Sequence, residues 1–393
     1  MPREVVVLSG VRTPIGGYGG SLKDIPPTDL AAHCVRQSVA RSNIQPADVG
    51  HVVFGNIIHT DARDHYLARV AGINGGLPRE TPALTLNRLC GSGLQAIITA
   101  AQTIMLGDAD AAVAGGAENM SRSPYLAPAM RWGARMNDTT LLDMMVGALH
   151  DPFDDCHMGV TAENVAKKYG VSREDQDKLA VESHRRAAHA IESGHFKDQI
   201  APVEIRVKRD TVMFDTDETV RPDSTVEKLA ALRPVFDKHG TVTAGNASSI
   251  NDAAAAVVLM DRELADRRGL EPLGRLVAYS YAGVDPKYMG IGPVPAVRSL
   301  LDKTGLTIGD FDVFEVNEAF AAQALAVTRE LKLPADKTNP LGSGISLGHP
   351  VGATGAILAI KALYELKRTG GRRALVTMCI GGGQGIAAVF ERD

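Results

Sequence analysis

The chain has 393 residues, of which 45% are hydrophobic and 22% are charged, with a formal net charge of −4. This length allows two or three domains with substantial cores, and the composition is typical of a soluble globular protein. The mildly acidic net charge excludes the basic patch of a protein that binds nucleic acid or an anionic membrane surface. Four cysteines in so long a chain exclude a disulfide scaffold, so we expect a reducing compartment.

The first predicted element is the strand "REVVVLSG" at residues 3–10. It lacks the apolar core of a signal peptide and the Arg/Ser bias of a transit peptide. No later segment approaches the roughly 18 apolar residues of a membrane span. We therefore expect a cytoplasmic protein with neither a nucleic acid nor a membrane as partner.

Strands and helices alternate in the first and last thirds of the chain, which predicts an α/β layer architecture. The two thirds also follow one order, which indicates a duplication. "QPADVGHVVFGN", ending at Asn56, corresponds to "IGDFDVFEVN", ending at Asn317. Each copy continues with a glycine-containing turn, an apolar helix and a strand that ends in glycines. Cys90 and His349 thus fall at equivalent points, and packing of the halves about a pseudo-twofold axis would bring both helix starts to one interface.

The two copies differ in the connection between their last two strands. In the second copy "GGGQ" joins them, whereas in the first copy residues 117–249 intervene, and we interpret these as an inserted domain that can act as a lid or ligand arm. The predicted domains are an N-terminal half at 1–116 and 250–270, an inserted loop domain at 117–249, and a C-terminal half at 271–393.

Three stretches in the copies carry candidate chemistry. Cys90 in "LCGSG" stands at a predicted helix start, where free N–H groups and the helix dipole favour a thiolate; a buried cysteine beside a tight turn is the alternative. His349 in "SLGHPVGATGA" can take the Cys90 proton or be structural. Cys379 in "MCIGGGQG" can be a core residue, but the glycines after it leave N–H groups free to face an oxyanion.

Two further stretches are less specific. Asn317 in "EVNEAFAAQ" can hold a water or an oxyanion, or can cap the following helix. "DDCHMG" at residues 154–159 groups Asp154, Asp155, Cys156 and His157, but sequence neighbours seldom point at one ion and no CxxC or HExxH pattern is present. We expect no metal site.

Together these stretches resemble the thiolase family over essentially the whole chain. The resemblance rests on "NRLCGSGLQAI", "GGAENMS", "HMGVTAENVA", "GTVTAGNAS", "MGIGPVPA", "NEAFAAQA", "GHPVGATGA" and "CIGGGQG" in this order. It is strongest to the bacterial biosynthetic acetyl-CoA acetyltransferases and the broad-specificity β-ketothiolases of polyester-storing bacteria. It implies a duplicated five-layered α-β-α-β-α fold with an inserted loop domain.

The resemblance also implies an activity. This is the reversible Claisen condensation of two acetyl-CoA to acetoacetyl-CoA and CoA, by a ping-pong mechanism through acyl-Cys90. It extends to acetyl-CoA with propionyl-CoA, giving 3-ketovaleryl-CoA. Coenzyme A thioesters would be substrate and product, with no prosthetic group. "SPYLAPAMRWGARMND" resembles the family's tetramer-forming loop, which implies a homotetramer built as a dimer of dimers.

The resemblance implies roles for individual residues. Cys90 would be the acylated nucleophile, His349 its base, and Cys379 the second acid/base. Asn317 would hold a water in one oxyanion hole with His349, and the N–H groups of Cys90 and Gly381 would form the other. Two contacts to coenzyme A are implied, Arg221 at the adenine and Ser248 at the pantetheine. The walls of the pantetheine tunnel and acyl pocket would be Leu149, His157, Met158, Ala244, Met289, Ala319 and Phe320.

Two positions depart from the family pattern. Leu341 stands where the family usually has Asn, in the loop that leads to His349. Ser249 stands where Gly is usual, which would store strain of order 1 kcal/mol if the backbone there needs a positive φ. Three other classes of protein fit these residues less well. A decarboxylating ketosynthase would have His or Asn at position 379. A non-catalytic acyl-CoA or lipid carrier would tolerate loss of any one of Cys90, His349 and Cys379, and a cysteine hydrolase would have no use for a second thiol.

Overall fold

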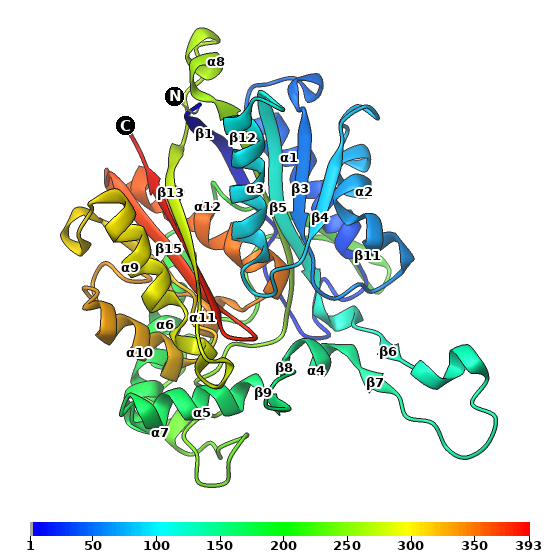
Figure 1. Cartoon of the computed structure of the whole chain (residues 1–393), viewed down its shortest axis with the longest axis vertical. Helices are drawn as coiled ribbons and strands as arrows, with labels where there is room; N and C mark the ends of the chain where they lie inside the picture. Colours follow the sequence, from blue (N-terminus) through cyan, green and yellow to red (C-terminus); the bar gives the residue numbers. More distant parts are fainter. Residues whose placement is uncertain (1–2) are drawn as a thin grey trace.

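The computed structural model describes residues 3–393. Its centre is a ten-stranded sheet with the order β14-β15-β16-β13-β1-β12-β5-β3-β4, and β2 pairs with β12 (Figure 1). The strands from the first copy are β1 (Val5–Arg12), β2 (Gly16–Gly17), β3 (His51–Gly55), β4 (Ala83–Leu86), β5 (Ala111–Asn119) and β12 (Asn251–Asp261). Those from the second copy are β13 (Gly274–Gly283), β14 (Val313–Val316), β15 (Arg373–Ile380) and β16 (Gln384–Glu391).

The pairing of the strands repeats the predicted duplication. β3 is parallel to β5, which is antiparallel to β12, and β14 is parallel to β15, which is antiparallel to β16. The halves meet through a short antiparallel pairing of Val5, Val6 and Val7 on β1 with β13. One hydrogen-bonded sheet therefore continues through both halves, and its two halves are the two β layers of the fold.

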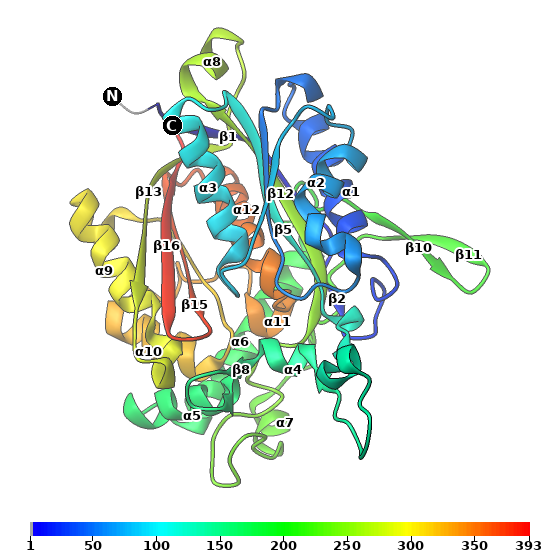
Figure 2. The same ribbon diagram turned by 45° about the vertical axis from the view of Figure 1, so that its right-hand side comes forward.

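Helices complete the five layers. α1 (Pro27–Arg41) and α2 (Leu67–Asn74) pack on the outer face of the first half, and α9 (Pro293–Thr304) and α10 (Ala321–Leu331) on that of the second. α3 (Ser92–Leu106) and α12 (Val351–Thr369) lie between the halves (Figures 1 and 2). The predicted duplicated α-β-α-β-α fold is confirmed. Among residues 3–393, one helical segment, Leu89–Leu106, is long and apolar enough to span a membrane. It contains α3, whose buried apolar side chains are part of the central core.

Glycines allow α3 and α12 to cross closely near their N-termini. A Cβ atom at Gly93 of α3 would lie 2.7 Å from the backbone N of Ala356, and one at Gly355 of α12 would overlap the backbone N of Leu94. Any larger residue would push the helices apart, because backbone atoms cannot move aside as a side chain can. This crossing brings the two helix starts to one place.

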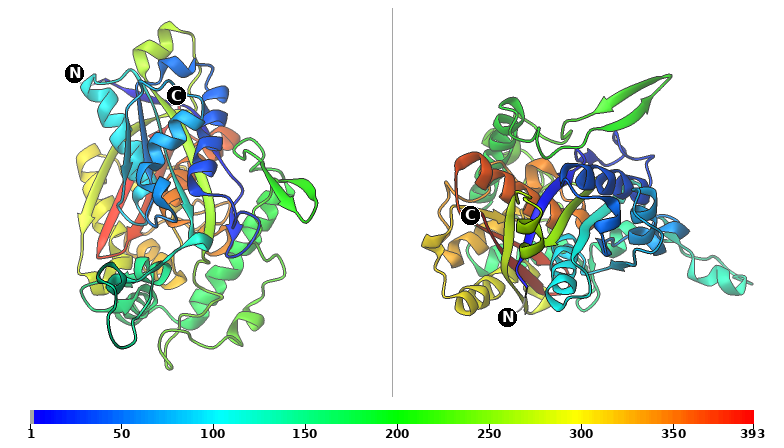
Figure 3. Two further views of the ribbon diagram at one scale, coloured as in Figure 1. Left: turned by 90° about the vertical axis from the view of Figure 1, so that its right-hand side faces the viewer. Right: turned by 90° about the horizontal axis from the view of Figure 1, so that it is seen from above.

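The inserted segment leaves the sheet after Asn119 and returns at Asn251. It contains helices and hairpins: α4 (Met144–Ala148), α5 (Met158–Lys168), α6 (Arg173–Glu192), α7 (Val226–Ala230), β6 (Tyr125–Leu126) with β7 (Leu142–Asp143), β8 (His150–Asp151) with β9 (Cys156–His157), and β10 (Val203–Val207) with β11 (Asp210–Phe214). α5 and α7 lie beyond one end of the sheet, and the β6–β7 arm and the β10–β11 hairpin project from the body (Figures 1, 2 and 3).

The remaining helices and turns connect these elements. They are α8 (Arg262–Arg267), α11 (Gly344–Leu347), and the short 3-10 turns η1 (Pro46–Asp48), η2 (Ala62–Tyr66), η3 (Met120–Arg122), η4 (Pro128–Trp132), η5 (Pro286–Ile291) and η6 (Ile308–Asp310).

A buried ion pair ties the inserted segment to the sheet. The Arg12 guanidinium on β1 donates two hydrogen bonds to the Asp217 carboxylate, at 2.7 and 2.9 Å, and both side chains are fully buried. Its Nε donates to Gln199 Oε1 at 2.9 Å, and its charge lies over the Phe196 ring. Removing either charge would leave the other buried without a counter-charge, which typically costs about 3–5 kcal/mol. The pair therefore fixes the chain immediately before Arg221.

Candidate active site

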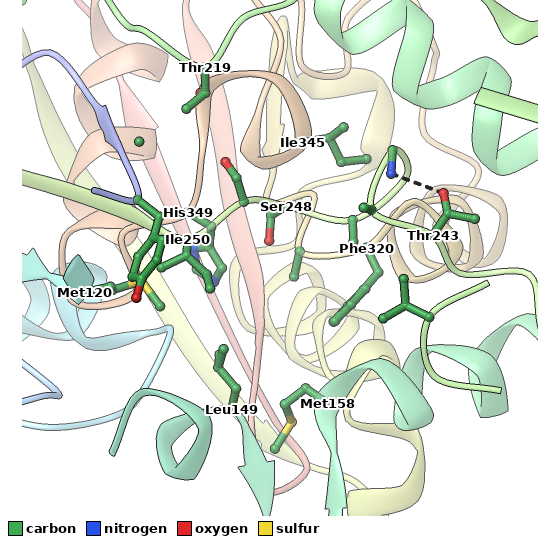
Figure 4. Close-up of a pocket in the computed structure, with 18 of the residues that line it drawn as sticks. Met120, Leu149, Met158, Thr219, Thr243, Ser248, Ile250, Phe320, Ile345 and His349 are labelled. Atoms are coloured by element: carbon green, nitrogen blue, oxygen red, sulfur yellow. Dashed lines mark hydrogen bonds between the residues drawn. The ribbon is translucent and has the colours of Figure 1, made fainter. Parts of the chain in front are cut away.

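One cavity of about 940 Å³ lies where the two helix starts meet the inserted segment (Figure 4). Of the site residues predicted from the sequence, all but Asn317 line it: Cys90, Leu149, His157, Met158, Arg221, Ala244, Ser248, Met289, Ala319, Phe320, His349, Cys379 and Gly381. Figure 4 shows His349 beside Ile250 and Met120, with Met158 and Leu149 on the opposite wall. Residues far apart in the sequence therefore share one cavity.

Cys90 stands directly before Gly91, the N-cap of α3. The preceding Leu89 has a left-handed backbone (φ 45°), a conformation that costs a non-glycine residue of order 1–3 kcal/mol. Two hydrogen bonds hold this turn: Leu89 N donates to Asn87 Oδ1 at 2.8 Å, and Ser92 Oγ donates to the Leu89 carbonyl at 2.7 Å. The turn presents the thiol to the cavity.

The protonation of Cys90 differs from the expectation of a thiolate at a helix start. Burial raises the pKa of the Cys90 thiol to about 11, although the backbone N–H groups of Gly381 and of Cys90 itself act in the opposite direction. The effect of desolvation on the pKa of Cys90 therefore outweighs the effect of the N–H groups at the helix start, and the resting residue is a neutral thiol. Such a thiol needs a base before it can act as a nucleophile.

His349 stands directly before Pro350, the N-cap of α12, and burial lowers the pKa of its imidazole to about 4. Its Nδ1 lies 2.7 Å from Thr354 Oγ1, and that hydroxyl donates its own proton to the Pro350 carbonyl at 2.9 Å. Thr354 Oγ1 must then accept from Nδ1–H, which leaves the lone pair on Nε2. His349 is thus a neutral base at neutral pH.

Two side chains complete the surroundings of His349. Its backbone N–H donates to Asn251 Oδ1 at 2.8 Å, and its Nε2 lies 3.4 Å from Asn317 Nδ2. Asn317 is fully buried, and its Oδ1 has no hydrogen-bond partner among residues 3–393. A buried amide oxygen without a partner is a place for a polar ligand atom or an ordered water. The alternative that Asn317 caps a helix is wrong, because α10 has Phe320 as its N-cap.

Cys379 lies at the end of β15, buried in an apolar cluster with Met158, Met289 and Phe320. Burial raises the pKa of its thiol, and the neighbouring Cys90 raises it further. The turn into β16 contains Gly382 (φ 77°) and Gly383 (φ 83°), backbone conformations that favour glycine. The two thiols therefore face one space, next to a turn whose Gly381 N–H points to Cys90.

The inserted segment supplies the polar part of the cavity wall. The Arg221 N–H donates to His184 Nδ1 at 3.1 Å, and burial lowers the pKa of His184 to about 4. Thr219 Oγ1 donates to the Leu347 carbonyl at 2.9 Å, which connects this wall to the loop before His349. Ser248 N donates to the Ala319 carbonyl at 3.0 Å.

Both departures from the family pattern fit the structure. Ser249 has no positive φ, so the conditional strain does not arise; its hydroxyl donates to Asn251 Oδ1 at 2.9 Å, the atom that also accepts from His349 N. Leu341 is buried in the central core. Lys361 Nζ donates to the Gly342 carbonyl at 2.5 Å and so anchors that loop.

The acidic stretch at residues 154–159 does not converge on one point. His150 pairs with Asp155 at 2.9 Å, and Asp154 lies 3.7 Å from Lys287 Nζ. The His157 ring stacks on Phe236 at 4.7 Å between centroids. Within residues 3–393, no group of three or more His, Cys, Asp or Glu side chains has an arrangement that can hold a metal ion.

Several residues at this site were not predicted from the sequence. Thr354 lies in "GHPVGATGA" and Asn251 lies three residues after "GTVTAGNAS", but their contacts to His349 come from the tertiary fold. The spacing of Thr354, one helical turn into α12, could have indicated it. Met120, which lies in "GGAENMS", also lines the cavity, as do Phe236 and Thr219, which no local pattern marks.

Comparison with known proteins gives a consistent result. The thiolase N-terminal domain family matches residues 5–263, and the thiolase C-terminal domain family matches residues 270–392. The chain is 66% identical to β-ketothiolase BktB of Cupriavidus necator, over 100% of both chains. Among solved structures it is similar to the Bacillus anthracis acetyl-CoA acetyltransferase (TM-score 0.97, 46% identity, 99% of both chains). It is also similar to human mitochondrial 3-ketoacyl-CoA thiolase in complex with CoA (TM-score 0.96, 43% identity, 100% of this chain and 98% of that one).

The raised pKa of Cys90 predicts how its alkylation depends on pH. Since the thiol has a pKa of about 11, its reaction with iodoacetamide should accelerate roughly tenfold per pH unit between about pH 7 and 9, without a plateau. Peptide mass spectrometry separates Cys90 from Cys156, which lies on a hairpin outside the cavity. A Cys90 rate that is already constant from about pH 7 would show a preformed thiolate and contradict this account.

Thr354 offers a matched pair of substitutions. Thr354→Val keeps the shape but cannot accept from His349 Nδ1–H, so the imidazole can take the tautomer that protonates Nε2. We expect it to lower kcat for the activity of this site roughly 10- to 100-fold, whereas Thr354→Ser, which keeps the hydroxyl, should stay within a few-fold of the wild type. Equal rates for the valine and serine variants would refute the role of this hydrogen bond.

Proposed function

The chain belongs to the thiolase family, and on that premise we propose that it works as a β-ketothiolase. It condenses two acetyl-CoA to acetoacetyl-CoA and CoA in a reversible Claisen reaction, through an acyl group carried on Cys90. One observation supports this most strongly: Cys90, Cys379 and a neutral His349 line the same cavity. A cysteine hydrolase needs only one of the two thiols, and a ketosynthase would have His or Asn in place of Cys379.

Acylation begins with proton transfer from Cys90 Sγ to His349 Nε2. The thiolate attacks the thioester carbonyl of acetyl-CoA, and the backbone N–H groups of Cys90 and Gly381 donate to the oxyanion. Each such donor is worth about 3 kcal/mol to a transition state of this type. The C–S bond to coenzyme A then breaks, and the departing thiolate takes the proton of Cys379. The products are acetyl-Cys90, an imidazolium at His349 and a thiolate at Cys379.

Condensation uses the charges that acylation leaves behind. The Cys379 thiolate removes a proton from C2 of a second acetyl-CoA, and the raised pKa of this buried thiol makes it a strong base. The enolate oxygen accepts from His349 Nε2–H and from a water held by Asn317. The enolate carbon attacks acetyl-Cys90, the Cys90–acyl bond breaks, and Cys90 regains the proton from His349. Protons and bonds balance over the cycle.

The cavity wall suits acyl groups of more than one length. Met158 and Met289 border it, and methionine side chains adapt to ligands of different shape because they are unbranched and flexible. The similarity to a β-ketothiolase extends over the whole chain. We therefore include acetyl-CoA with propionyl-CoA, giving 3-ketovaleryl-CoA, in the proposed activity.

Coenzyme A is proposed to bind along the inserted segment. Arg221 would contact the adenine and Ser248 the pantetheine, and the tunnel walls would be Leu149, His157, Met158, Ala244, Met289, Ala319 and Phe320. All of these residues line the one cavity, which supports the assignment. The reaction uses coenzyme A thioesters as substrate and product and needs no prosthetic group.

The β6–β7 arm supports an assembly of several copies. It carries exposed apolar side chains, including Trp132 at 84% and Met136 at 85% exposure, and it projects from the body (Figure 3). A monomer seldom exposes so many large apolar groups on one segment. We propose a cytoplasmic homotetramer, a dimer of dimers, with a three-part division of the chain at 1–116 with 250–270, 117–249 and 271–393.

Replacing Cys379 separates the two half-reactions. The wild type should cleave acetoacetyl-CoA and 3-ketovaleryl-CoA with free CoA, and chromatography of the acyl-CoA products measures this cleavage. Cys379→Ala should still release CoA from acetyl-CoA once per subunit, but more slowly because CoA must leave as an unprotonated thiolate, while condensation falls at least about 10³-fold because no base acts at C2. Absence of any 3-ketoacyl-CoA cleavage by the wild type would overturn the proposed function, and full condensation by the variant would overturn the role of Cys379.

A further inference from the structure

The strand register places Glu118 in the first half where Cys379 stands in the second. β3 pairs with β5 through Gly55 and Gly116, and β14 pairs with β15 through Val316 and Thr377. Glu118 and Cys379 each lie two residues beyond these pairs. The antiparallel neighbours agree, since Gly116 pairs with Ala255 and Thr377 with Ala387, and Glu118 then pairs with Ala253 and Cys379 with Gly385.

The two equivalent residues make reciprocal contacts across the interface between the halves. Cys379, from the second half, lines the same cavity as Cys90 at the start of α3, and the charge of Cys90 adds to burial in raising the pKa of Cys379. Glu118, from the first half, meets the start of α12: its Oε2 accepts from Gly352 N at 3.0 Å. A Cβ atom at Gly352 would lie 2.5 Å from that oxygen, so the approach requires glycine. Each strand end therefore faces the helix start of the other half.

Glu118 is surrounded by hydrogen-bond donors. The fully buried carboxylate accepts from Ile57 N at 3.1 Å, Ile58 N at 3.0 Å, Gly352 N at 3.0 Å and Asn56 Nδ2 at 3.2 Å. Asn56 is the counterpart of Asn317 in the duplication. Burial raises the pKa of Glu118 to about 8 and the three N–H donors oppose that shift, so the protonated and ionised forms are both present near neutral pH, and both keep oxygen acceptors for these donors. Such a set of donors at a helix N-terminus suits a carboxylate.

We propose that Glu118 is a positioning residue for His349. It fixes the first turn of α12, three residues after His349, to the chain at residues 56–58 and to β5 of the other half. The imidazole then keeps its place relative to Cys90 when substrate enters and leaves. Glu118 touches no reacting atom; its charge also adds to burial in raising the pKa of Cys90, and the exchange of backbone amides in α12 distinguishes its hold on the helix from that effect. The test of Glu118 by enzyme activity rests on the proposed thiolase reaction, whereas the test by hydrogen exchange of the α12 amides does not.

Glu118→Gln tests the proposal, because it keeps the size of the side chain and replaces one acceptor by a donor. We expect kcat for acetoacetyl-CoA thiolysis, per subunit that can be acylated, to fall roughly 10- to 100-fold, with KM for the 3-ketoacyl-CoA within about twofold. Glu118→Asp, which keeps the carboxylate, should recover part of the loss. Hydrogen exchange of backbone amides at 349–356 should be faster in Glu118→Gln than in the wild type.

Asp261→Asn is the matched control. Asp261 is also buried in the first half, and its Oδ1 accepts from Leu264 N at the start of α8 at 2.9 Å, but it has no hydrogen bond to α12. We expect its kcat and its exchange at 349–356 to match the wild type within about twofold. A loss of kcat as large as that of Glu118→Gln would show a general effect of buried carboxylates and overturn the proposal.

The remaining outcomes also decide the proposal. Glu118→Gln with kcat and exchange unchanged overturns it, and so does a loss confined to KM. If Glu118→Gln does not accumulate in folded form, Glu118→Asp is scored alone: faster exchange at 349–356 with a lower kcat supports the proposal, and wild-type values overturn it. A wild-type protein without thiolase activity would refute the proposed function, and the exchange experiment would still decide the role of Glu118.

Discussion

The close crossing of α3 and α12 is the constraint on which the rest of this molecule depends. Gly93 and Gly355 let the two helices approach with backbone against backbone. Each helix start then lies within reach of a strand end from the other half. Cys90 faces Cys379, and the turn after His349 meets Glu118. A duplicated fold thus builds a site that neither half contains alone, and the two related corners have diverged into a thiol and a carboxylate.

Removal of water sets the chemistry at this crossing. In the resting protein, burial raises the pKa of Cys90 to about 11 and lowers that of His349 to about 4, so both groups are neutral. Charges would form only when substrate occupies the cavity, where N–H groups of the two glycine-containing turns can donate hydrogen bonds to a negatively charged oxygen. A buried site of this kind pays no solvent reorganisation at the moment of reaction. The Thr354 and Asn251 hydrogen bonds keep the imidazole oriented in the meantime.

Much of this arrangement follows from the sequence, because order and spacing survive in a duplicated chain. The alternation of elements and the equivalence of Asn56 with Asn317 predicted the layered fold, which the structure confirms. Physical contacts that depend on tertiary packing could not be predicted. The thiolate expected at Cys90 is one case, since helix position can be read from the sequence and desolvation cannot. Another is the ion pair of Arg12 with Asp217, whose residues are far apart in the chain. A third is the equivalence of Glu118 with Cys379, which follows from the pairing register of the strands and from no local pattern in the sequence.

The central claim is that Cys90 becomes the acyl carrier of a site assembled from both halves. It is tested most directly by mixing the protein with acetyl-CoA, quenching within the first turnover and locating the modification by peptide mass spectrometry. We predict an increase of about 42 Da on the peptide that contains Cys90 and on no other cysteine peptide. An unmodified Cys90 peptide, or an acetyl group on Cys379 instead, would contradict the account.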